Sequence, residues 1–173
     1  MRLVAVAGYS GEPPNELARA CTRFVDLLAE RCGKSVALLL GGYWGVMRIV
    51  VDRALQRGLT VVVMPPLERE DTAFPEGCIV IRTGTSYRVR SVFLARACDA
   101  LVALGGASGT MQEIITAYCE GKPVLVLRSG LDTDRLEALA PYIDRRALTR
   151  VEFFLTPEGL VDRLAEVLGC GKG

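Results

Sequence analysis

The sequence predicts a doubly wound α/β domain, in which a mostly parallel sheet of about seven strands carries helices on both faces. Two observations lead to this prediction. Short apolar runs alternate with amphipathic segments along the whole chain. Several of these runs, such as residues 100–104 (Ala-Leu-Val-Ala-Leu), are apolar throughout, as is typical of strands buried on both faces of a sheet. The chain of 173 residues is long enough to bury the core that such a sheet requires.

The N-terminal part of the chain predicts three strands and two helices. Residues 3–7 form an apolar strand, which a loop containing glycine and proline follows. Residues 15–31 form a helix because their apolar side chains recur at helical spacing. The second strand covers residues 35–40, and the second helix covers residues 46–57 and ends before a glycine. The third strand, residues 59–64, is rich in β-branched residues, which favour strands.

The middle of the chain contains the longest predicted loop. Residues 65–77 are polar and long for a connection in an α/β domain, so they are a candidate lid or interface. A fourth strand covers residues 78–82, and a helix covers residues 86–98. The apolar strand at residues 100–104 comes next. A helix over residues 111–119 follows it, with apolar residues three and four positions apart and a glycine just beyond its end.

The C-terminal part predicts two further strands and a final helix. Residues 123–127 are the sixth strand, residues 132–142 a helix or loop, and residues 151–155 the seventh strand. The final helix begins after Thr156, which is a suitable N-cap, and has proline in its first position. These elements together predict a single Rossmann-like domain over residues 1–173, with no internal repeat.

A glycine-rich turn joins the strand at residues 100–104 to the following helix. Such a turn leaves backbone N–H groups free at the positive end of a helix dipole, where a phosphate binds well. The predicted phosphate-binding residues are Gly105, Gly106, Ala107, Ser108, Gly109 and Thr110. Glu113, one turn into the helix, is then placed to face the ligand. An alternative stays open, because Thr110 and Glu113 have the spacing of a capping box, in which Glu113 bonds to an amide of its own helix.

Glycine-containing turns also follow the first and second strands, at the same edge of the predicted sheet. Ligands of doubly wound sheets bind outside the carboxyl ends of the strands. The residues expected to contact a ligand there are Gly8, Ser10, Gly41, Gly42 and Gly45. Tyr43 and Trp44 are placed either to stack on a base or to close the cleft wall, while Trp44 could equally pack in the core or at a subunit contact. The first turn lacks the glycine spacing and acidic residue of a dinucleotide site, which argues against NAD.

The composition excludes several classes of chemistry. The chain has no His, which removes His-based acid–base, nucleophilic and metal chemistry. Its six Cys residues form no Cys-x-x-Cys pair, so we predict no metal site, and we expect Cys98 and Cys119 to be buried free thiols. A net charge of +1 gives no electrostatic case for nucleic acid or an anionic membrane. With no apolar run of membrane-spanning length and no signal-peptide pattern, we expect a soluble, cytoplasmic protein.

Arg88 and Arg90 lie in the first turns of the helix that precedes the central strand. From Arg90, the chain continues through Asp-Ala-Leu-Val-Ala-Leu to Gly-Gly-Ala-Ser-Gly-Thr-Met-Gln-Glu. This arrangement resembles the LONELY GUY (LOG) family, many of whose members carry a "lysine decarboxylase" label. The family pattern is Pro-Gly-Gly-x-Gly-Thr-x-x-Glu, preceded by an Arg-Lys pair. Gly109, Thr110 and Glu113 match this pattern, and Arg90 matches its Arg.

The chain departs from the LOG pattern at three positions. Gly105 stands in place of the Pro, Ala107 in place of the second Gly, and Ser91 in place of the Lys. The segment Gly-Gly-Tyr-Trp-Gly-Val-Met at residues 41–47 is similar to the family's Gly-Gly-Gly-x-x-Gly-Leu-Met, but lacks its first Gly. These departures fit better with wider relatives of the fold, which include the molybdenum cofactor carrier proteins and the Rossmann-like domain of DNA-processing protein A.

The resemblance implies a nucleotide-phosphate-binding protein, and one implied activity is that of a nucleoside 5′-monophosphate phosphoribohydrolase. Such an enzyme releases the free base and ribose 5-phosphate. Glu113 and Arg90 are then the catalytic residues: Glu113 stabilises positive charge on the ribose, and Arg90 orients the substrate. The alternative is a non-enzymatic carrier or sensor of a phosphorylated cofactor. The hydrolase activity requires no cofactor. We do not expect nucleic acid to be a partner. The resemblance also implies a homodimer or larger homo-oligomer.

Overall fold

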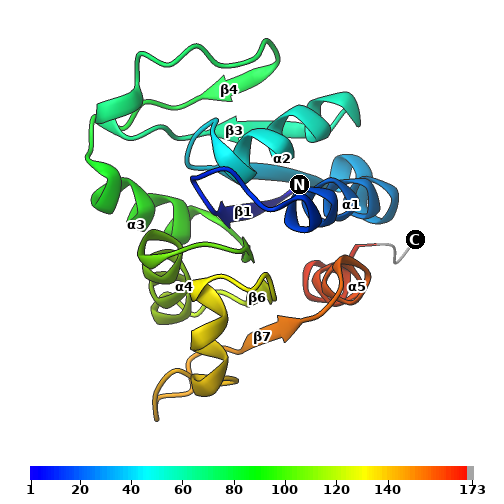
Figure 1. Ribbon diagram of the computed structural model, residues 1–173, viewed down its shortest axis with the longest axis vertical. Coiled ribbons are helices and arrows are strands. Elements are labelled where there is room, and N and C mark those ends of the chain that lie inside the picture. The colour runs from blue at the N-terminus through cyan, green and yellow to red at the C-terminus, as the bar shows by residue number, and fades with distance from the viewer. Residues whose placement is uncertain (171–173) are drawn as a thin grey trace.

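The computed structural model describes residues 1–170 and confirms the predicted fold class. The strands are β1 (Arg2–Gly8), β2 (Val36–Leu40), β3 (Thr60–Val63), β4 (Cys78–Val80), β5 (Ala100–Leu104), β6 (Val124–Leu127) and β7 (Val151–Phe154). They form one seven-stranded sheet in the order β4-β3-β2-β1-β5-β6-β7 (Figure 1). Every neighbouring pair runs parallel. β1 therefore lies at the centre of the sheet, and the strands on its two sides are added in opposite directions.

Helices cover both faces of this sheet. They are α1 (Asn15–Cys32), α2 (Gly45–Gln56), α3 (Tyr87–Ala97), α4 (Ser108–Cys119) and α5 (Pro157–Leu168), with short 3-10 turns η1 (Gly33–Ser35), η2 (Leu67–Arg69) and η3 (Asp132–Leu139). The segment predicted as helix or loop after β6 is thus a 3-10 helix. α4 begins at Ser108, earlier than the predicted start at residue 111, because Ala107 is the last residue with extended backbone. None of the described residues forms a helix that is long and apolar enough to span a bilayer.

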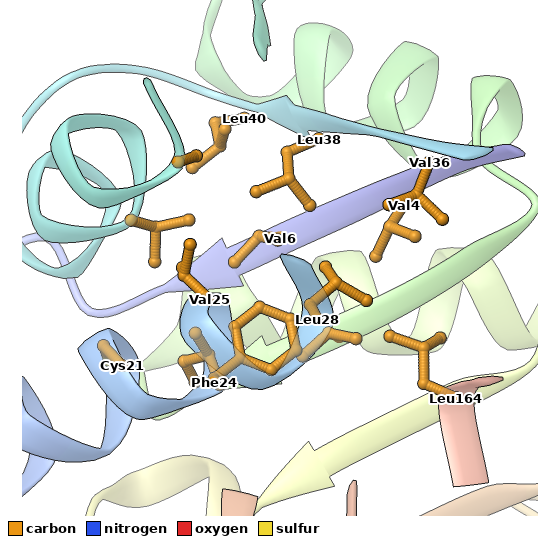
Figure 2. Packing of buried hydrophobic residues seen from close by; sticks show 14 of the residues in the cluster. Val4, Val6, Cys21, Phe24, Val25, Leu28, Val36, Leu38, Leu40 and Leu164 are labelled. Atoms are coloured by element: carbon orange, nitrogen blue, oxygen red, sulfur yellow. The ribbon is translucent and has the colours of Figure 1, made fainter. Parts of the chain in front are cut away.

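The core has two parts, one on each face of the sheet. One part packs α1, α2 and α5 on the sheet, and the other packs α3 and α4 on the opposite face. In Figure 2, Val4 and Val6 of β1 lie against Phe24 and Leu28 of α1. Burying each side chain of this size stabilises the fold by about 1.5–3 kcal/mol relative to leaving it in water. Because both faces of the sheet are covered here, residues 4–7 of β1 and all five residues of β2 are buried and apolar, as the sequence indicated.

Within residues 1–170, no helix covers the half of the sheet made by β3 and β4 on the face that carries α3 and α4. Val62 of β3 belongs to this face and pairs with Ile79 of β4. Ile79 is 52% exposed, and Ile81 just beyond the strand is 42% exposed. α3 on the same side of the sheet also exposes apolar side chains, those of Val89 (47%), Val92 (36%) and Phe93 (46%). Apolar surface therefore remains on this face of the chain.

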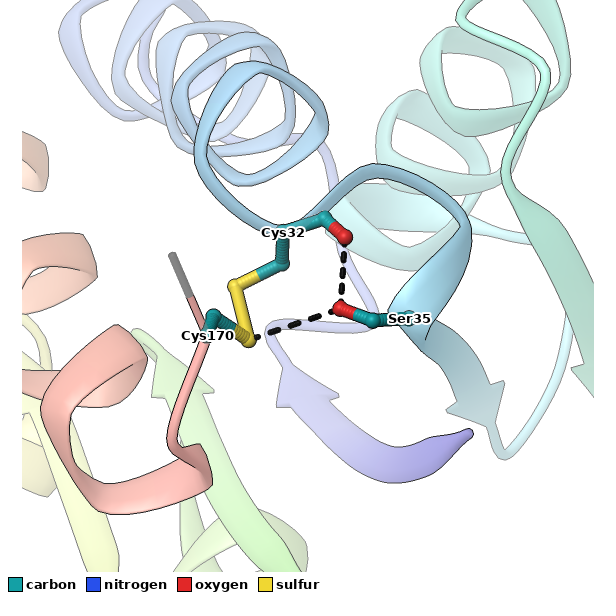
Figure 3. The surroundings of a disulfide bond; sticks show 3 residues. All are labelled: Cys32, Ser35 and Cys170. Atoms are coloured by element: carbon teal, nitrogen blue, oxygen red, sulfur yellow. Dashed lines mark hydrogen bonds between the residues drawn. A yellow bond between two sulfur atoms is a disulfide. The ribbon is translucent and has the colours of Figure 1, made fainter. Parts of the chain in front are cut away.

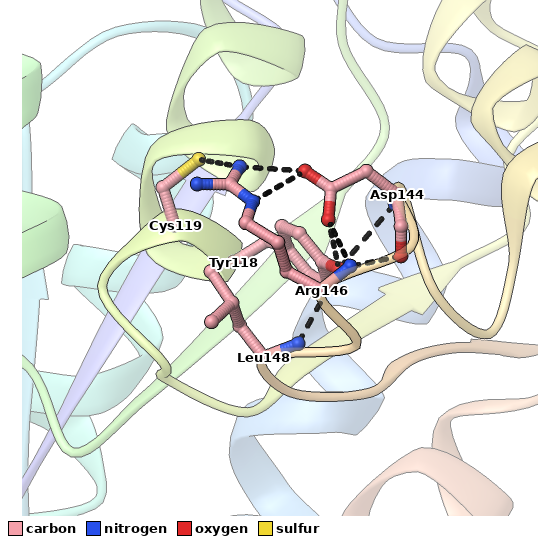
Figure 4. Close-up of polar contacts among 5 residues, drawn as sticks. All are labelled: Tyr118, Cys119, Asp144, Arg146 and Leu148. Atoms are coloured by element: carbon pink, nitrogen blue, oxygen red, sulfur yellow. Dashed lines mark hydrogen bonds and ion pairs between the residues drawn. The ribbon is translucent and has the colours of Figure 1, made fainter.

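A buried tyrosine ties the loop before β7 to α4 (Figure 4). The Tyr118 hydroxyl donates to Asp144 Oδ1 at 3.1 Å, and the Leu148 N–H donates to the same hydroxyl at 3.4 Å. Arg146 Nε donates to Asp144 Oδ2 at 3.0 Å. Cys119 is exposed, so the prediction that it is buried is wrong: it is the last residue of α4, and its side chain meets solvent and Arg146. Cys98 is buried, as predicted.

A disulfide joins the end of α1 to the residue that follows α5 (Figure 3). It links Cys32 to Cys170 with a Cα–Cα distance of 5.1 Å. The Ser35 hydroxyl donates to the Cys32 carbonyl at 2.6 Å, which fixes the turn next to the bond. The sequence had given no basis for pairing these two residues.

Candidate functional site

The main cleft lies where β1 and β5 diverge. These two strands are neighbours, and Gly8 at the end of β1 pairs with Leu104 at the end of β5. The chain leaves them toward opposite halves of the sheet, which opens a crevice at their carboxyl ends, as expected for a doubly wound sheet. The cleft has a volume of about 660 Å³. Its lining residues are Gly8, Tyr9, Ser10, Tyr43, Trp44, Met47, Arg69, Thr72, Tyr87, Arg88, Arg90, Ser91, Ala107, Ser108, Gly109, Thr110 and Glu113.

One wall of this cleft is the first turn of α4. Ala107 is its N-cap residue, and within residues 1–170 the helix has no side-chain cap hydrogen bond. The N–H groups of a first helical turn have no acceptor within the helix, so those of Ser108, Gly109 and Thr110 are available to a ligand. Ala107 and Ser108 are exposed to the cleft, whereas the Thr110 side chain is buried and reaches the Gly8 carbonyl at 3.5 Å. This is a geometry suited to an anion.

The alternative reading of Thr110 and Glu113 as a capping box is wrong. Thr110 lies inside the first turn of α4 instead of preceding it, because the helix starts at Ser108. Glu113 does not fold back onto its own helix. Its Oε1 accepts hydrogen bonds from the Ser91 hydroxyl at 2.9 Å and from Arg90 Nη1 at 3.4 Å, both on α3.

Arg90, Ser91 and Glu113 form a buried polar cluster at the base of the cleft. They are 5%, 4% and 8% exposed. Burial raises the pKa of the Glu113 carboxyl, while the Arg90 guanidinium and the Ser91 hydroxyl oppose this rise. Burial lowers the pKa of Arg90, and the Glu113 carboxylate opposes that change. Arg90 Nε is buried without a hydrogen-bond partner within residues 1–170, so this cation has a donor left over.

The glycines after β2 support the site from behind and do not line the cleft. A Cβ on Gly41 would lie 1.7 Å from Arg90 Nη1, so only glycine leaves room for this guanidinium. A Cβ on Gly42 would lie 2.2 Å from the Trp44 ring. Gly45 has φ +54°, and a Cβ there would lie 2.3 Å from the Tyr9 carbonyl oxygen. These three glycines were predicted to contact a ligand. In the structure they lie behind the cleft wall instead, where they make room for Arg90, Trp44 and the loop at Tyr9.

Gly105 and Gly106 also lie behind the wall. Gly105 has φ +69°, in the left-handed region that favours glycine. A Cβ on Gly106 would lie 2.1 Å from Thr110 Oγ1, so glycine is needed for the chain to turn into α4. The other predicted residues of this turn (Ala107, Ser108, Gly109 and Thr110), together with Gly8 and Ser10 after β1, line the cleft directly.

Several lining residues were not predicted from the sequence. Ser91 was seen only as a departure from the LOG pattern, yet it is the shortest contact of Glu113. Arg69 comes from the long loop after β3, and Tyr87 from the start of α3. Only the candidate-lid reading of residues 65–77 pointed to Arg69. Arg88 Nη1 donates to Gln112 Oε1 at 3.4 Å, which holds its guanidinium beside the first turn of α4.

The aromatic residues after β2 form part of the cleft wall. Trp44 is half-buried and lines the cleft, so it contacts both the core and the open space. Tyr43 also lines the cleft, and its hydroxyl donates to Asp52 Oδ1 at 2.6 Å, so this hydroxyl is bonded within the protein. Within the described part of the chain, no group of three or more Cys, Asp or Glu residues is arranged to hold a metal ion.

The sequence matches a family model and a protein of an archaeon. Residues 1–152 match the model described as LDcluster4, SLOG cluster4 family. An uncharacterized protein of Archaeoglobus fulgidus is 34% identical over 119 residues, which are 69% of this chain and 76% of that protein.

Solved structures match nearly the whole chain. The X-ray structure of TM1055 is 33% identical with a TM-score of 0.85 and covers 96% of this chain and 99% of that one. The molybdenum cofactor carrier protein of Chlamydomonas reinhardtii is 22% identical with a TM-score of 0.78, covering 97% of this chain and 98% of that one. This second likeness shows the shared fold alone. It confirms the resemblance to the molybdenum cofactor carriers at the level of the fold.

Proposed function

Because the chain belongs to the SLOG cluster4 family, we propose that its cleft binds the phosphate group of a nucleotide or of a phosphorylated cofactor. The observation that carries the proposal is the uncapped first turn of α4, which opens into the cleft. Its free N–H groups and the helix dipole favour an anion. Arg88 adds a guanidinium at the same place: its Nη1 lies 3.4 Å from the position of a Cβ on Gly109. Arginine is well suited to phosphate because its planar fork matches two oxygens at once.

The finer proposal is hydrolysis of nucleoside 5′-monophosphates. With the phosphate on α4, Glu113 one turn further in lies near the ribose. Water then adds to C1′ as the bond from C1′ to the base nitrogen breaks, the water proton passes to the departing base, and ribose 5-phosphate remains. The Glu113 carboxylate stabilises the positive charge that develops on the sugar, where a fixed charge is most effective. Ser91 and Arg90 both bond to Oε1, which leaves Oε2 for the ligand.

The second candidate is a carrier that binds a phosphorylated cofactor without turnover. Two observations favour it. Ser91 stands where the LOG pattern has a Lys, so the cleft has one cation fewer than that pattern supplies. The fold also matches a protein named as a molybdenum cofactor carrier. Both candidates share the phosphate site, and they differ only in whether a bond in the ligand breaks.

The test separates binding from turnover. Calorimetry with AMP and with ribose 5-phosphate measures binding, and chromatography of an AMP incubation detects free adenine. For the hydrolase, we expect Glu113→Gln to retain binding and lose adenine release, while Arg19→Ala, in the remote groove between α1 and α2, changes neither. Binding with no adenine release indicates the carrier. If no phosphorylated ligand binds, the phosphate site itself is disproved.

We also propose that the chain forms a homodimer or larger homo-oligomer, as the resemblance implied. The exposed Val89, Val92 and Phe93 on α3 support this proposal, as does the exposed Ile79 on β4, because large apolar side chains gathered on a surface mark an interface. Light scattering coupled to gel filtration measures the mass. We expect the parent chain to have the mass of a dimer or larger oligomer and the Phe93→Glu variant to be a monomer. A parent chain that is already monomeric contradicts the proposal.

A further inference from the structure

The wall of the cleft on the far side of β1 from α4 carries a flat aromatic surface. Trp44 is the only Trp of the chain and immediately precedes α2. Its ring lies directly over Gly42, where a Cβ would approach within 2.2 Å of the indole, so the backbone holds the ring in place from beneath. The strand order β2-β1-β5 puts the phosphate turn of α4 on one side of β1 and this indole on the other.

The side chain of Arg69 lies over the Trp44 ring. The guanidinium carbon of Arg69 lies 5.7 Å from the centre of the Trp44 ring, within the range of a cation–π interaction. Arg69 belongs to η2 in the long loop after β3, and its side chain is exposed. Its Nε donates one hydrogen bond of 3.3 Å to the Tyr87 hydroxyl. A planar guanidinium group therefore lies over the Trp44 ring, held by one long hydrogen bond and a cation–π contact at the exposed end of a long side chain.

From this arrangement we propose that Trp44 and Arg69 form a subsite for the ring of the ligand, which is a planar nitrogen heterocycle carrying a phosphorylated substituent. The ring stacks on the indole, and Arg69 moves outward to cover the other side of the ring. Guanidinium groups and indoles both stack on flat conjugated rings. The Tyr87 hydroxyl and the Arg69 N–H groups then lie at the ring edge, where heterocycle nitrogen and oxygen atoms accept hydrogen bonds. This inference rests on the proposed function, because the α4 site holds the phosphate of the same ligand.

A purine nucleotide and a phosphorylated pterin share this chemistry, and the experiment distinguishes them. Calorimetry measures the Kd of AMP, of 6-hydroxymethylpterin phosphate and of ribose 5-phosphate, which lacks a ring. We expect at least one of the ring-bearing ligands to bind about tenfold or more tightly than ribose 5-phosphate, as stacking of one base on an aromatic side chain provides. Fluorescence excited at the red edge of indole absorption reports on Trp44 alone, and it should respond to the ring-bearing ligand that binds and not to ribose 5-phosphate.

The variants separate stacking from general stability. Trp44→Leu should remove the preference for the ring and leave the Kd of ribose 5-phosphate unchanged, while Trp44→Phe should keep part of the preference. Arg69→Ala should weaken only the ring-bearing ligands. The matched control is Arg48→Ala, because Arg48 also stacks on an aromatic ring, that of Tyr43 at 5.6 Å, but does not line the cleft.

The outcomes distinguish this subsite from the phosphate site. If all three ligands bind equally, or if the preference for a ring survives in Trp44→Leu, the subsite is disproved while the phosphate site stands. If a ring-bearing ligand binds and neither ribose 5-phosphate nor inorganic phosphate competes with it, the subsite stands and the phosphate site fails. If none of the ligands binds, both proposals are wrong.

Discussion

Gly41 shows how a single missing side chain supports the polar cluster. It lies under the Arg90 guanidinium, and a Cβ at this position would clash with it at 1.7 Å. We expect Gly41→Ala to displace Arg90 and to lower the free energy of unfolding by about 1–3 kcal/mol, the usual cost of overfilling a packed site. Urea unfolding measures the change.

Gly159→Ala is the matched control for this substitution. Its Cβ would meet the nearest atoms at 3.5 and 3.6 Å, which is ordinary contact, and Gly159 lies in the first turn of α5. We expect it to leave stability unchanged or raise it slightly, because alanine favours a helix over glycine. Equal effects of the two substitutions would contradict the role given to Gly41.

At the level of single residues, the sequence predicted which residues lie at the site better than it predicted which side chains contact one another there. Glu113 was found because its spacing from the glycine turn puts it one helical turn inward, and Arg90 because it matches the Arg of the LOG pattern. Ser91 was not found, because its bond to Glu113 depends on how α3 packs against α4, and no local pattern encodes that packing. The glycines at 41, 42 and 45 were identified as special, but the sequence could not show that they make room for Arg90, Trp44 and the Tyr9 loop.

The helices α5 and α4 differ in how their first turns are satisfied. The Thr156 hydroxyl accepts a hydrogen bond of 3.3 Å from the Gly159 N–H, which confirms the predicted N-cap of α5. We expect Thr156→Ala to lower the free energy of unfolding by about 1 kcal/mol. Ser108→Ala should have little effect, because no side chain caps α4. Chemical denaturation of both variants tests this difference, and a comparable loss in Ser108→Ala would mean that α4 is capped after all.

The loop before β7 depends on an ion pair that titrates in acid. The hydrogen bond from Arg146 is the main cause that lowers the pKa of Asp144 to about 2, compared with about 3.9 in an unfolded chain. The pair therefore stabilises the fold fully above about pH 4, and this contribution is lost as the pH falls toward 2. Asp144→Asn should melt lower than the parent at pH 6, with the two melting temperatures converging between pH 4 and pH 2. Thermal melts across this range measure the effect, and a constant difference would contradict the ion pair.

The element boundaries also show what a sequence pattern can resolve. The apolar pattern located every α-helix and strand of residues 1–170, because each α-helix packs one face on the sheet and the sheet is covered on both faces. It placed the start of α4 too late, since Ser108, Gly109 and Thr110 contribute no apolar side chain to that periodicity. Those residues are the ones that form the proposed phosphate site, so the pattern was weakest where the backbone itself contacts the cleft.

The disulfide constrains the molecule as a whole. It joins Cys32 to Cys170 across a sequence separation of 138 residues, and a native disulfide typically stabilises a fold by about 2–4 kcal/mol, mainly by constraining the unfolded chain. We expect a reductant to lower the free energy of unfolding by that amount, and Cys170→Ser to show the same loss without a response to reductant. Cys119→Ser, which removes an exposed free thiol, should behave like the parent. A parent protein in which thiol titration finds all six cysteines free would contradict this prediction.

The fold as a whole was predictable because its determinants are local and repeated: buried strands without polar alternation, helices between them, and glycine where strand turns into helix. The opening between β1 and β5 follows from the direction in which the chain leaves each strand, whatever side chains stand there. The existence of this cleft thus depends on the order in which the chain connects the strands, and the ligand that it selects depends on the side chains of a few loops. Exchanging residues on those loops can therefore refit the same scaffold to a different small molecule without rebuilding the framework beneath it.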